Sequence, residues 1–136
     1  HQDGYYYMVQ PVEGLTMWLG LDVADEENGG LRYVKGSHQL GLRPHARTQT
    51  LGFSQGITDY GNAYDLEHER MYTAEPGDLL VHHALTVHRA DGNKSADRPR
   101  AALGFVYLSN QVKENAEGLE AYRTQLAADW LKQGKI

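Results

Sequence analysis

The chain begins with two side chains of the kinds that bind metal ions, His1 and Asp3, separated by one residue. In an extended strand, residues i and i+2 point to the same face, so an extended start would bring these two side chains together and turn Gln2 away. Gly4 follows directly and can accept a bend or a close approach of the backbone. A histidine and an aspartate at this spacing also occur by chance, so a site needs a further ligand.

That further ligand is His88, in the stretch GDLLVHHALTVHRADGN. We expect two short strands here, with His88 near the end of the second strand and just before the polar turn at residues 91–93. Alone, a histidine in this place is more often hydrogen-bonded than bound to a metal. Together with His1 and Asp3 it gives two imidazoles and one carboxylate, the facial set that leaves positions open on a non-haem Fe(II).

Composition limits the choice of ligands. The chain has no cysteine, which excludes disulfides and thiolate zinc sites and leaves seven histidines and the carboxylates. His82 and His83 compete with His88 for the third position. Both lie inside an apolar strand, so we expect one of them to face the core or to support the ligands from behind.

Arg100 is the candidate for binding an anionic group. Pro99 precedes it, which is tolerated at the start or edge of a strand, and the small residues Ala102 and Gly104 share its face. A guanidinium with space around it is suited to bidentate capture of a carboxylate. An exposed, salt-bridging arginine is the alternative, and Arg98 has the same parity but belongs to the preceding loop.

The elements that must position these residues are mainly strands. β-Branched and aromatic residues gather in short runs between Gly, Asn and Asp, which predicts strands at 5–10, 15–23, 31–34, 71–74, 78–83, 86–89 and 100–108. Leu119, Tyr122, Leu126 and Trp130 recur at helical spacing, which predicts one C-terminal helix that covers the sheet. With no repeat and no linker, residues 1–136 form a single domain.

Residues 41–69 carry several glycines and no sustained periodicity, so we expect a long loop. It is either a surface excursion or a mobile lid over the site, with Phe53, Tyr60 and Tyr64 as its apolar surface. A small basic cluster in the same stretch could meet an anionic substrate; it consists of Arg43, His45 and Arg47.

Composition also bounds the partners. With 136 residues, 40% hydrophobic and 23% charged, the chain is an ordinary soluble composition that can bury one core. The net charge of −5 and the scattered basic residues argue against nucleic acid, and no apolar run is long enough for a membrane span or a leader. We expect a soluble protein, with the cytoplasm favoured, whose oligomeric state the composition does not decide.

In order along the chain, HQD, LTMWLGLDV, ENGGLRYVKGSH, GLRPH, GDLLVHHALTVH, GNKS and RAA resemble the phytanoyl-CoA dioxygenase family of Fe(II)/2-oxoglutarate oxygenases, over residues 1 to about 108. The resemblance implies a double-stranded β-helix, a jelly-roll barrel of the cupin-like kind. It implies His1, Asp3 and His88 as iron ligands and catalytic residues, Arg100 on the distal carboxylate of 2-oxoglutarate, and Trp18 beside the cosubstrate. Trp18 as an ordinary core residue is the alternative.

The implied activity is hydroxylation of a small organic substrate, with Fe(II) as cofactor, 2-oxoglutarate and O2 as cosubstrates, and succinate and CO2 as products. Related halogenases have a small residue in place of the aspartate, so Asp3 favours hydroxylation. His38 and Asn93 also match family positions, as supports of strand ends. Acyl-CoA thioesters and other small metabolites both stay open as substrates.

Two departures from the family pattern stand out. The family often has Gly-Ser after its distal histidine, whereas this chain has Arg89 and Ala90, which puts one hydrogen bond to the cosubstrate in doubt. Family members also carry a helical region and a first barrel strand ahead of the first histidine. We therefore expect a chain that lacks the N-terminal part of the fold.

Two other functions are considered. If His1 were a processed N-terminus, its amine and imidazole could bind copper with a second histidine, as in histidine-brace oxygenases. A catalytically silent β-barrel that only binds metal is the other alternative.

Overall fold

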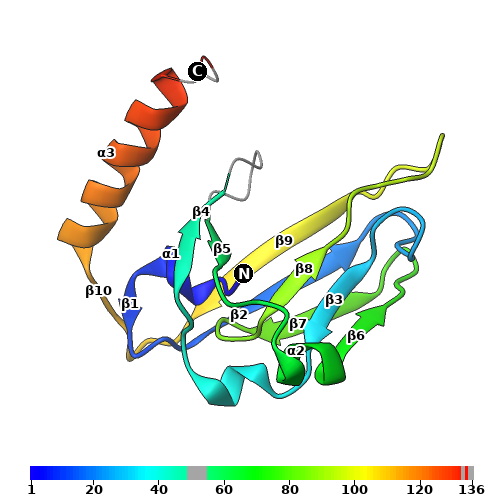
Figure 1. The fold of residues 1–136 in the computed structure, drawn as a ribbon, viewed down its shortest axis with the longest axis horizontal. Helices are drawn as coiled ribbons and strands as arrows, with labels where there is room; N and C mark the ends of the chain where they lie inside the picture. The colour runs from blue at the N-terminus through cyan, green and yellow to red at the C-terminus, as the bar shows by residue number, and fades with distance from the viewer. Residues whose placement is uncertain (49–54, 133, 135–136) are drawn as a thin grey trace.

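The computed structural model describes residues 1–48, 55–132 and 134, and strands dominate it, as predicted. Two antiparallel three-stranded sheets form the body of the molecule, in the orders β7-β2-β9 and β6-β3-β8 (Figure 1). The described strands do not close into a barrel. The bounds of these six strands are β2 Gly14–Gly20, β3 Leu31–Val34, β6 Glu69–Tyr72, β7 Leu79–His83, β8 His88–Ala90 and β9 Ala102–Leu108.

The other elements lie around these sheets. Two small two-stranded sheets pair β1 with β10 and β4 with β5. The bounds are α1 Gly4–Tyr7, β1 Val9–Gln10, the 3-10 helix η1 Ser37–Leu40, β4 His45–Arg47, β5 Gln55–Ile57, α2 Ala63–His68, β10 Lys113–Glu114 and α3 Ala116–Lys132. Within the described ranges, every helix falls short, in length or in apolar content, of what a bilayer crossing requires.

Strand β2 is the centre of the first sheet. Thr16 lies opposite His82 of β7, and Trp18 lies between Leu80 of β7 and Gly104 of β9. Directly opposed residues share one face of a sheet, so these five side-chain positions lie on the same face. The other face is apolar and partly exposed, and includes Leu15 (40% exposed), Val81 (47%) and Phe105 (41%).

The β6-β3-β8 sheet faces the β7-β2-β9 sheet with the side that carries Tyr33. Tyr33 of β3 lies opposite His88 of β8. The ring of Tyr33 is 5.1 Å, centroid to centroid, from that of His82, and the rings of His82 and His88 are 4.3 Å apart. The two sheets therefore meet through aromatic and imidazole side chains.

Some of the most deeply buried side chains are polar. Gln2, Asn28 and Asp65 are at most 1% exposed, as are the apolar Val34 and Val87. Buried polar groups must be hydrogen-bonded to be tolerated. The packing around the sheets is therefore specified by hydrogen bonds as much as by apolar contact.

Several predicted strand boundaries are wrong. Residues 5–10 do not form one strand: the tyrosines make the short helix α1, closed by hydrogen bonds from Tyr5 N to Gln2 O and from Tyr6 N to Asp3 O. Tyrosine favours strands only where it packs on a sheet, and here its neighbours form a turn. His88 opens β8 instead of ending a strand, and β9 begins at Ala102, two residues after Arg100.

The C-terminal helix is confirmed as α3, but its expected place is wrong. No side chain of its described residues is buried, and it extends away from both sheets (Figure 1). The apolar stripe of Leu119, Tyr122, Leu126 and Trp130 therefore does not cover the sheet of this chain.

We predict that Gly29→Ala destabilises the chain more than Gly61→Ala. Both glycines have a positive φ, +89° and +95°, which costs a non-glycine residue on the order of 1–3 kcal/mol. A Cβ on Gly29 would in addition lie 2.2 Å from the carbonyl oxygen of Asp91, whereas a Cβ on Gly61 meets nothing within 4 Å. Urea unfolding of both variants measures the difference, and equal losses would contradict the predicted close approach.

Candidate metal centre

The backbones of His1 and His88 hold the first two candidate ligands together. His1 N donates to His88 O at 2.9 Å, and His88 N donates to His1 O at 3.0 Å. Two residues that each donate a backbone hydrogen bond to the other form a hydrogen-bonded pair, as in an antiparallel ladder. His1 therefore occupies the edge of β8 not used by β3, and the two imidazoles lie 4.2 Å apart, centroid to centroid.

Asp3 reaches the same place through a turn. Its φ of −61° and ψ of −33° are helical, and although it caps α1 its side chain makes no capping hydrogen bond. Gly4 N donates to Ala84 O at 2.8 Å, and a Cβ on Gly4 would lie 2.3 Å from a methyl group of Val12. Glycine is thus needed beside Asp3. The predicted convergence of His1 and Asp3 is confirmed, but the strand parity from which it was argued is wrong.

The three candidate ligands form one cluster. Asp3 Oδ1 lies 3.2 Å from His1 Nε2 and 3.5 Å from His88 Nε2. Ligand atoms of all three residues lie within 4.8 Å of one another. Two imidazoles and one carboxylate at this separation could hold a metal ion.

The second carboxylate oxygen of Asp3 is engaged elsewhere. Thr16 Oγ1 donates to Asp3 Oδ2 at 2.5 Å, and His82 Nε2 lies 3.0 Å from the same oxygen. Tyr7 Oη is hydrogen-bonded to Thr16 at 3.0 Å. Oδ1 therefore faces the histidine pair while Oδ2 is held from behind, and His82 takes the supporting place that was expected of either His82 or His83.

The protonation states suit metal binding. His88 Nδ1 donates to the carbonyl of Thr86 at 2.9 Å, so its Nε2 presents a lone pair toward Asp3. Burial, with the neighbouring His1, lowers the pKa of His88 to about 4. Burial alone would raise the pKa of Asp3, but the hydrogen bonds from His1 and His82 outweigh it and hold that pKa well below its usual range. A neutral imidazole and an ionised carboxylate are the forms that metals require.

Sequence reasoning missed Gln2, which is fully buried. Its Nε2 donates to the carbonyls of Gly41 (2.9 Å) and Leu85 (2.7 Å), and its Oε1 accepts from Arg43 N at 2.8 Å. Its backbone N–H donates to His45 Nε2 at 3.1 Å. The residue between two candidate ligands therefore fastens the segment ahead of β4 to the cluster. The sequence signalled only that its side chain points away from theirs.

The predicted basic cluster does not form a site for an anion. Arg43 pairs with Asp65, which is 1% exposed, and with Asp59. His45 is held by the backbones of Gln2 and Arg43, and Arg47 pairs with Asp129 of α3. Each of these bases already has a structural partner.

The predicted aperiodic loop at 41–69 instead contains β4, β5 and α2. Tyr60 Oη donates to Glu69, Tyr64 Oη donates to Lys35 O at 3.1 Å, and Tyr6 Oη donates to Gln55 O at 2.9 Å. Phe53 lies outside the described residues. Two of these contacts tie Gln55 and Tyr64 to residues outside the segment. Motion of residues 41–69 as a lid stays a prediction.

Arg100 lies just before β9, and Asn28 fixes this stretch. The buried Asn28 donates through Nδ2 to Val23 O (2.7 Å) and Pro99 O (3.1 Å), and Arg100 donates to Gly29 O at 2.5 Å. Arg98 is bound to Asp25 and Glu27; in the described part of the chain, no carboxylate pairs with Arg100. Of the two arginines, Arg100 is the one that structural ion pairs leave available.

Trp18 shares its sheet face with Thr16, which contacts Asp3. A Cβ on Gly104, directly opposite Trp18, would meet nothing within 4 Å, so the sheet face is open above Gly104. Trp18 is neither fully buried nor fully exposed. It lies on the same face of the sheet as Thr16 and two residues after it in β2.

Arg89 and Ala90, which stand where the family often has Gly-Ser, lie on opposite faces of β8. Arg89 points away from the cluster and is bound by Glu69 at 2.8 Å, while Ala90 shares the face of His88. Asn93 donates to Arg98 O at 2.7 Å and so supports the loop after β8, as expected.

The chain is similar to known proteins over most of its length. The family model described as phytanoyl-CoA dioxygenase (PhyH) matches residues 1–102. Peroxisomal phytanoyl-CoA dioxygenase of Bos taurus is 32% identical over 101 residues, covering 70% of this chain and 29% of that protein. The 1-deoxypentalenic acid 11-beta-hydroxylase of Streptomyces arenae is 32% identical over 101 residues, covering 71% and 35%. This chain thus spans about a third of the length of these relatives.

A solved structure is similar over most of the chain. The epimerase SnoN in complex with Fe3+, alpha ketoglutarate and nogalamycin RO superimposes with a TM-score of 0.67 at 26% identity, covering 87% of this chain and 44% of that one. The family model covers the candidate ligands and Arg100, and the similar structure has the same arrangement of chain. The chain belongs to the phytanoyl-CoA dioxygenase family.

Proposed function

We propose that this chain carries the iron- and 2-oxoglutarate-binding core of a dioxygenase that hydroxylates a small organic substrate and releases succinate and CO2. The observation that supports this most is that the two carboxylate oxygens of Asp3 have different partners. Its Oδ1 faces the Nε2 atoms of His1 and His88, while its Oδ2 is held by His82 and Thr16. The two facing three-stranded sheets fit the core of a jelly roll.

In this proposal His1, Asp3 and His88 bind one Fe(II). Fe(II) with 2-oxoglutarate supplies the activation of O2 that hydroxylation needs. The donor set suits this metal, because imidazoles with one carboxylate leave positions open for other ligands. The carboxylate of Asp3 would take the position that a halide could otherwise use. Thr16 and His82 hold Oδ2, so Oδ1 would be the oxygen left to bind the metal.

Arg100 binds the distal carboxylate of 2-oxoglutarate, and Trp18 borders the cosubstrate. A guanidinium not already used in an ion pair can make two parallel hydrogen bonds to a carboxylate. Asn28 positions Arg100 by holding the carbonyl of Pro99. The open space above Gly104 leaves room for the carbon chain of the ligand.

The copper-brace alternative receives no support from the geometry. That site uses the backbone nitrogen of His1 as a metal ligand, whereas here this nitrogen donates to His88 O at 2.9 Å. A catalytically silent module would bind metal at the same cluster but would not convert 2-oxoglutarate. Oxygen-dependent conversion of 2-oxoglutarate to succinate by the iron-loaded protein therefore tests the proposal, and its absence over a broad substrate panel would favour the silent module.

The first prediction concerns the metal. Asp3→Ala and His88→Ala should each sharply weaken Fe(II) binding under anaerobic, halide-free conditions, because one protein ligand is lost and no halide is present to replace it. His82→Ala should weaken binding by roughly 10–100-fold, as loss of an outer hydrogen bond to a ligand commonly does. His68→Ala, in α2 and bonded to Tyr64 O, is the matched control and should bind normally. Undiminished binding by both ligand variants would disprove the assignment.

The second prediction separates the two arginines. Arg100→Ala should raise the dissociation constant of 2-oxoglutarate by roughly 10–100-fold while iron binding is kept, because a charged bidentate partner is lost. Arg98→Ala breaks the pairs with Asp25 and Glu27 on the surface and should leave that constant within about threefold. Anaerobic titration followed by the iron charge-transfer band measures both. The reverse order would assign the carboxylate to Arg98.

A further inference from the structure

Two hydroxyl groups connect α1 to the Asp3 carboxylate. Thr16 Oγ1 donates to Asp3 Oδ2 at 2.5 Å, and Tyr7 Oη lies 3.0 Å from Thr16 Oγ1. A threonine hydroxyl has a single hydrogen, which here is used on the carboxylate, so the bond between the two hydroxyls takes its hydrogen from Tyr7. The hydrogen bonds therefore run in one direction, from Tyr7 through Thr16 to Asp3.

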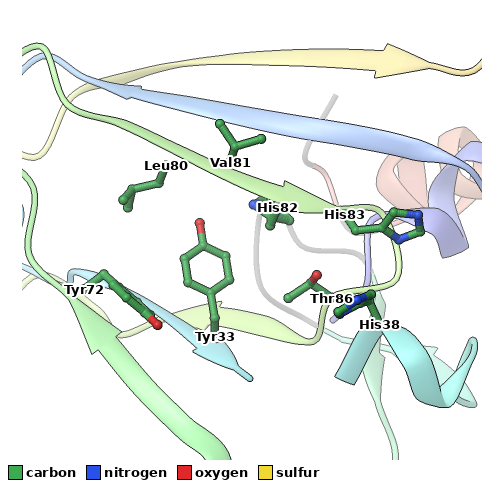
Figure 2. Close-up of a pocket in the computed structure, with 8 residues that line it drawn as sticks. All are labelled: Tyr33, His38, Tyr72, Leu80, Val81, His82, His83 and Thr86. Carbon is green, nitrogen blue, oxygen red and sulfur yellow. The ribbon is translucent and has the colours of Figure 1, made fainter. Parts of the chain in front are cut away.

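The backbone of Thr16 is fixed by the sheet. It lies in the central strand β2, which is paired on both sides, and is opposite His82 of β7. Figure 2 shows His82 on the side of β7 that faces Tyr33, and Val81 on the other side. As the cross-strand neighbour of His82, Thr16 shares this inner face. Because β-branching also restricts its χ1, the Thr16 hydroxyl is a fixed point from which a carboxylate can be oriented.

Helix α1 brings Tyr7 to the same place. Asp3 has helical φ and ψ, and Tyr7, the last residue of the helix, lies four residues after it. Side chains at i and i+4 lie on one face of a helical turn, so those of Asp3 and Tyr7 project to the same side. Met8 ends the helix directly afterwards with a φ of +48°, which is uncommon for a residue other than glycine. The helix therefore extends just far enough to place Tyr7 beside Thr16.

We propose that Tyr7 is a positioning residue, which fixes the orientation of the Asp3 carboxylate through the Thr16 hydroxyl. A separation of 2.5 Å is typical of a hydroxyl that donates to an ionised carboxylate, one of the stronger hydrogen bonds in proteins. A bond donated into Thr16 strengthens the bond that Thr16 donates onward. The effect on a bound metal rests on the proposed function, whereas the orientation of the carboxylate does not.

The two hydroxyls contribute something that His82 alone does not. A carboxylate held at one oxygen by a single group can still turn about that contact, whereas contacts from two neighbouring strands, Thr16 of β2 and His82 of β7, fix it. Threonine and tyrosine hydroxyls keep their hydrogen near neutral pH, while imidazole titrates in that range. The Tyr7–Thr16 chain therefore holds Oδ2 throughout the physiological pH range, and Oδ1 stays turned toward the two candidate histidine ligands.

A double-mutant cycle tests whether Tyr7 acts through Thr16. Tyr7→Phe and Thr16→Val each remove one hydroxyl and keep the size of the side chain, and the anaerobic dissociation constant of cobalt(II) is measured for both and for the double variant. Thr16→Val should weaken binding about tenfold, as loss of an outer contact to a ligand does, and Tyr7→Phe about threefold. The double variant should also be about tenfold weaker, because independent effects would instead multiply to about thirtyfold.

The visible absorption bands at saturating cobalt(II) separate positioning from a general loss of stability. Tyr7→Phe and Thr16→Val should shift these bands in the same direction, because the carboxylate on the metal is turned in both. Thr16→Ser keeps a hydroxyl and should retain the wild-type bands. Tyr64→Phe is the matched control: it loses a hydrogen bond of similar length, 3.1 Å to Lys35 O, in α2, and should change neither the bands nor the affinity.

A readout without metal keeps the two proposals distinguishable. In the metal-free protein, the three-bond NMR couplings of Asp3 Cγ to its own backbone N and C′ report the side-chain rotamer. Wild type and Thr16→Ser should show a single rotamer, and Thr16→Val and, to a smaller extent, Tyr7→Phe should move toward averaged values. Multiplying losses in the double variant, or wild-type bands and couplings in Tyr7→Phe, would overturn the inference. Undiminished cobalt(II) binding by Asp3→Ala would count against the proposed function, and the couplings would then decide the positioning role alone.

Discussion

The Asp3 carboxylate is the group on which the rest of the site depends. It is largely buried and kept ionised by the hydrogen bonds that surround it, and its two oxygens have different partners. Oδ1 is turned toward His1 and His88, and Oδ2 toward His82 and Thr16. A buried charge is tolerated only when it is paired and hydrogen-bonded. The imidazoles and the threonine hydroxyl are therefore as much a requirement of the fold as of the chemistry.

Buried side-chain amides fix the segments around that carboxylate. Gln2 ties the stretch before β4 to the turn that carries His1 and Asp3, and Asn28 ties the β2-β3 connection to the stretch before Arg100. Each amide uses donors and acceptors on backbone groups that belong to no strand pair. Short irregular segments are thereby held in place, which a site assembled from distant parts of the chain requires.

Local patterns in the sequence predicted most of the sheet strands and which residues converge, but not how they converge. Strand β3 and helix α3 follow from local patterns, and the order of motifs indicated the ligand set. The placement of Asp3 on a helical turn could not be predicted, because it depends on contacts of Gly4 with Val12 and Ala84, which are distant from it in the chain. The roles of Gln2 and Asn28 depend likewise on carbonyls that only the folded chain brings near.

The central claim is that two histidines and one carboxylate bind the iron while a third histidine supports the carboxylate. X-ray absorption of the Fe(II) protein without O2 tests it most directly, because imidazole rings give a distinct scattering pattern that can be counted. We expect two imidazoles on the iron in the wild-type protein, and two again in a His82→Ala variant at saturating iron. Three imidazoles in the wild type, falling to two in that variant, would contradict the account by making His82 a ligand.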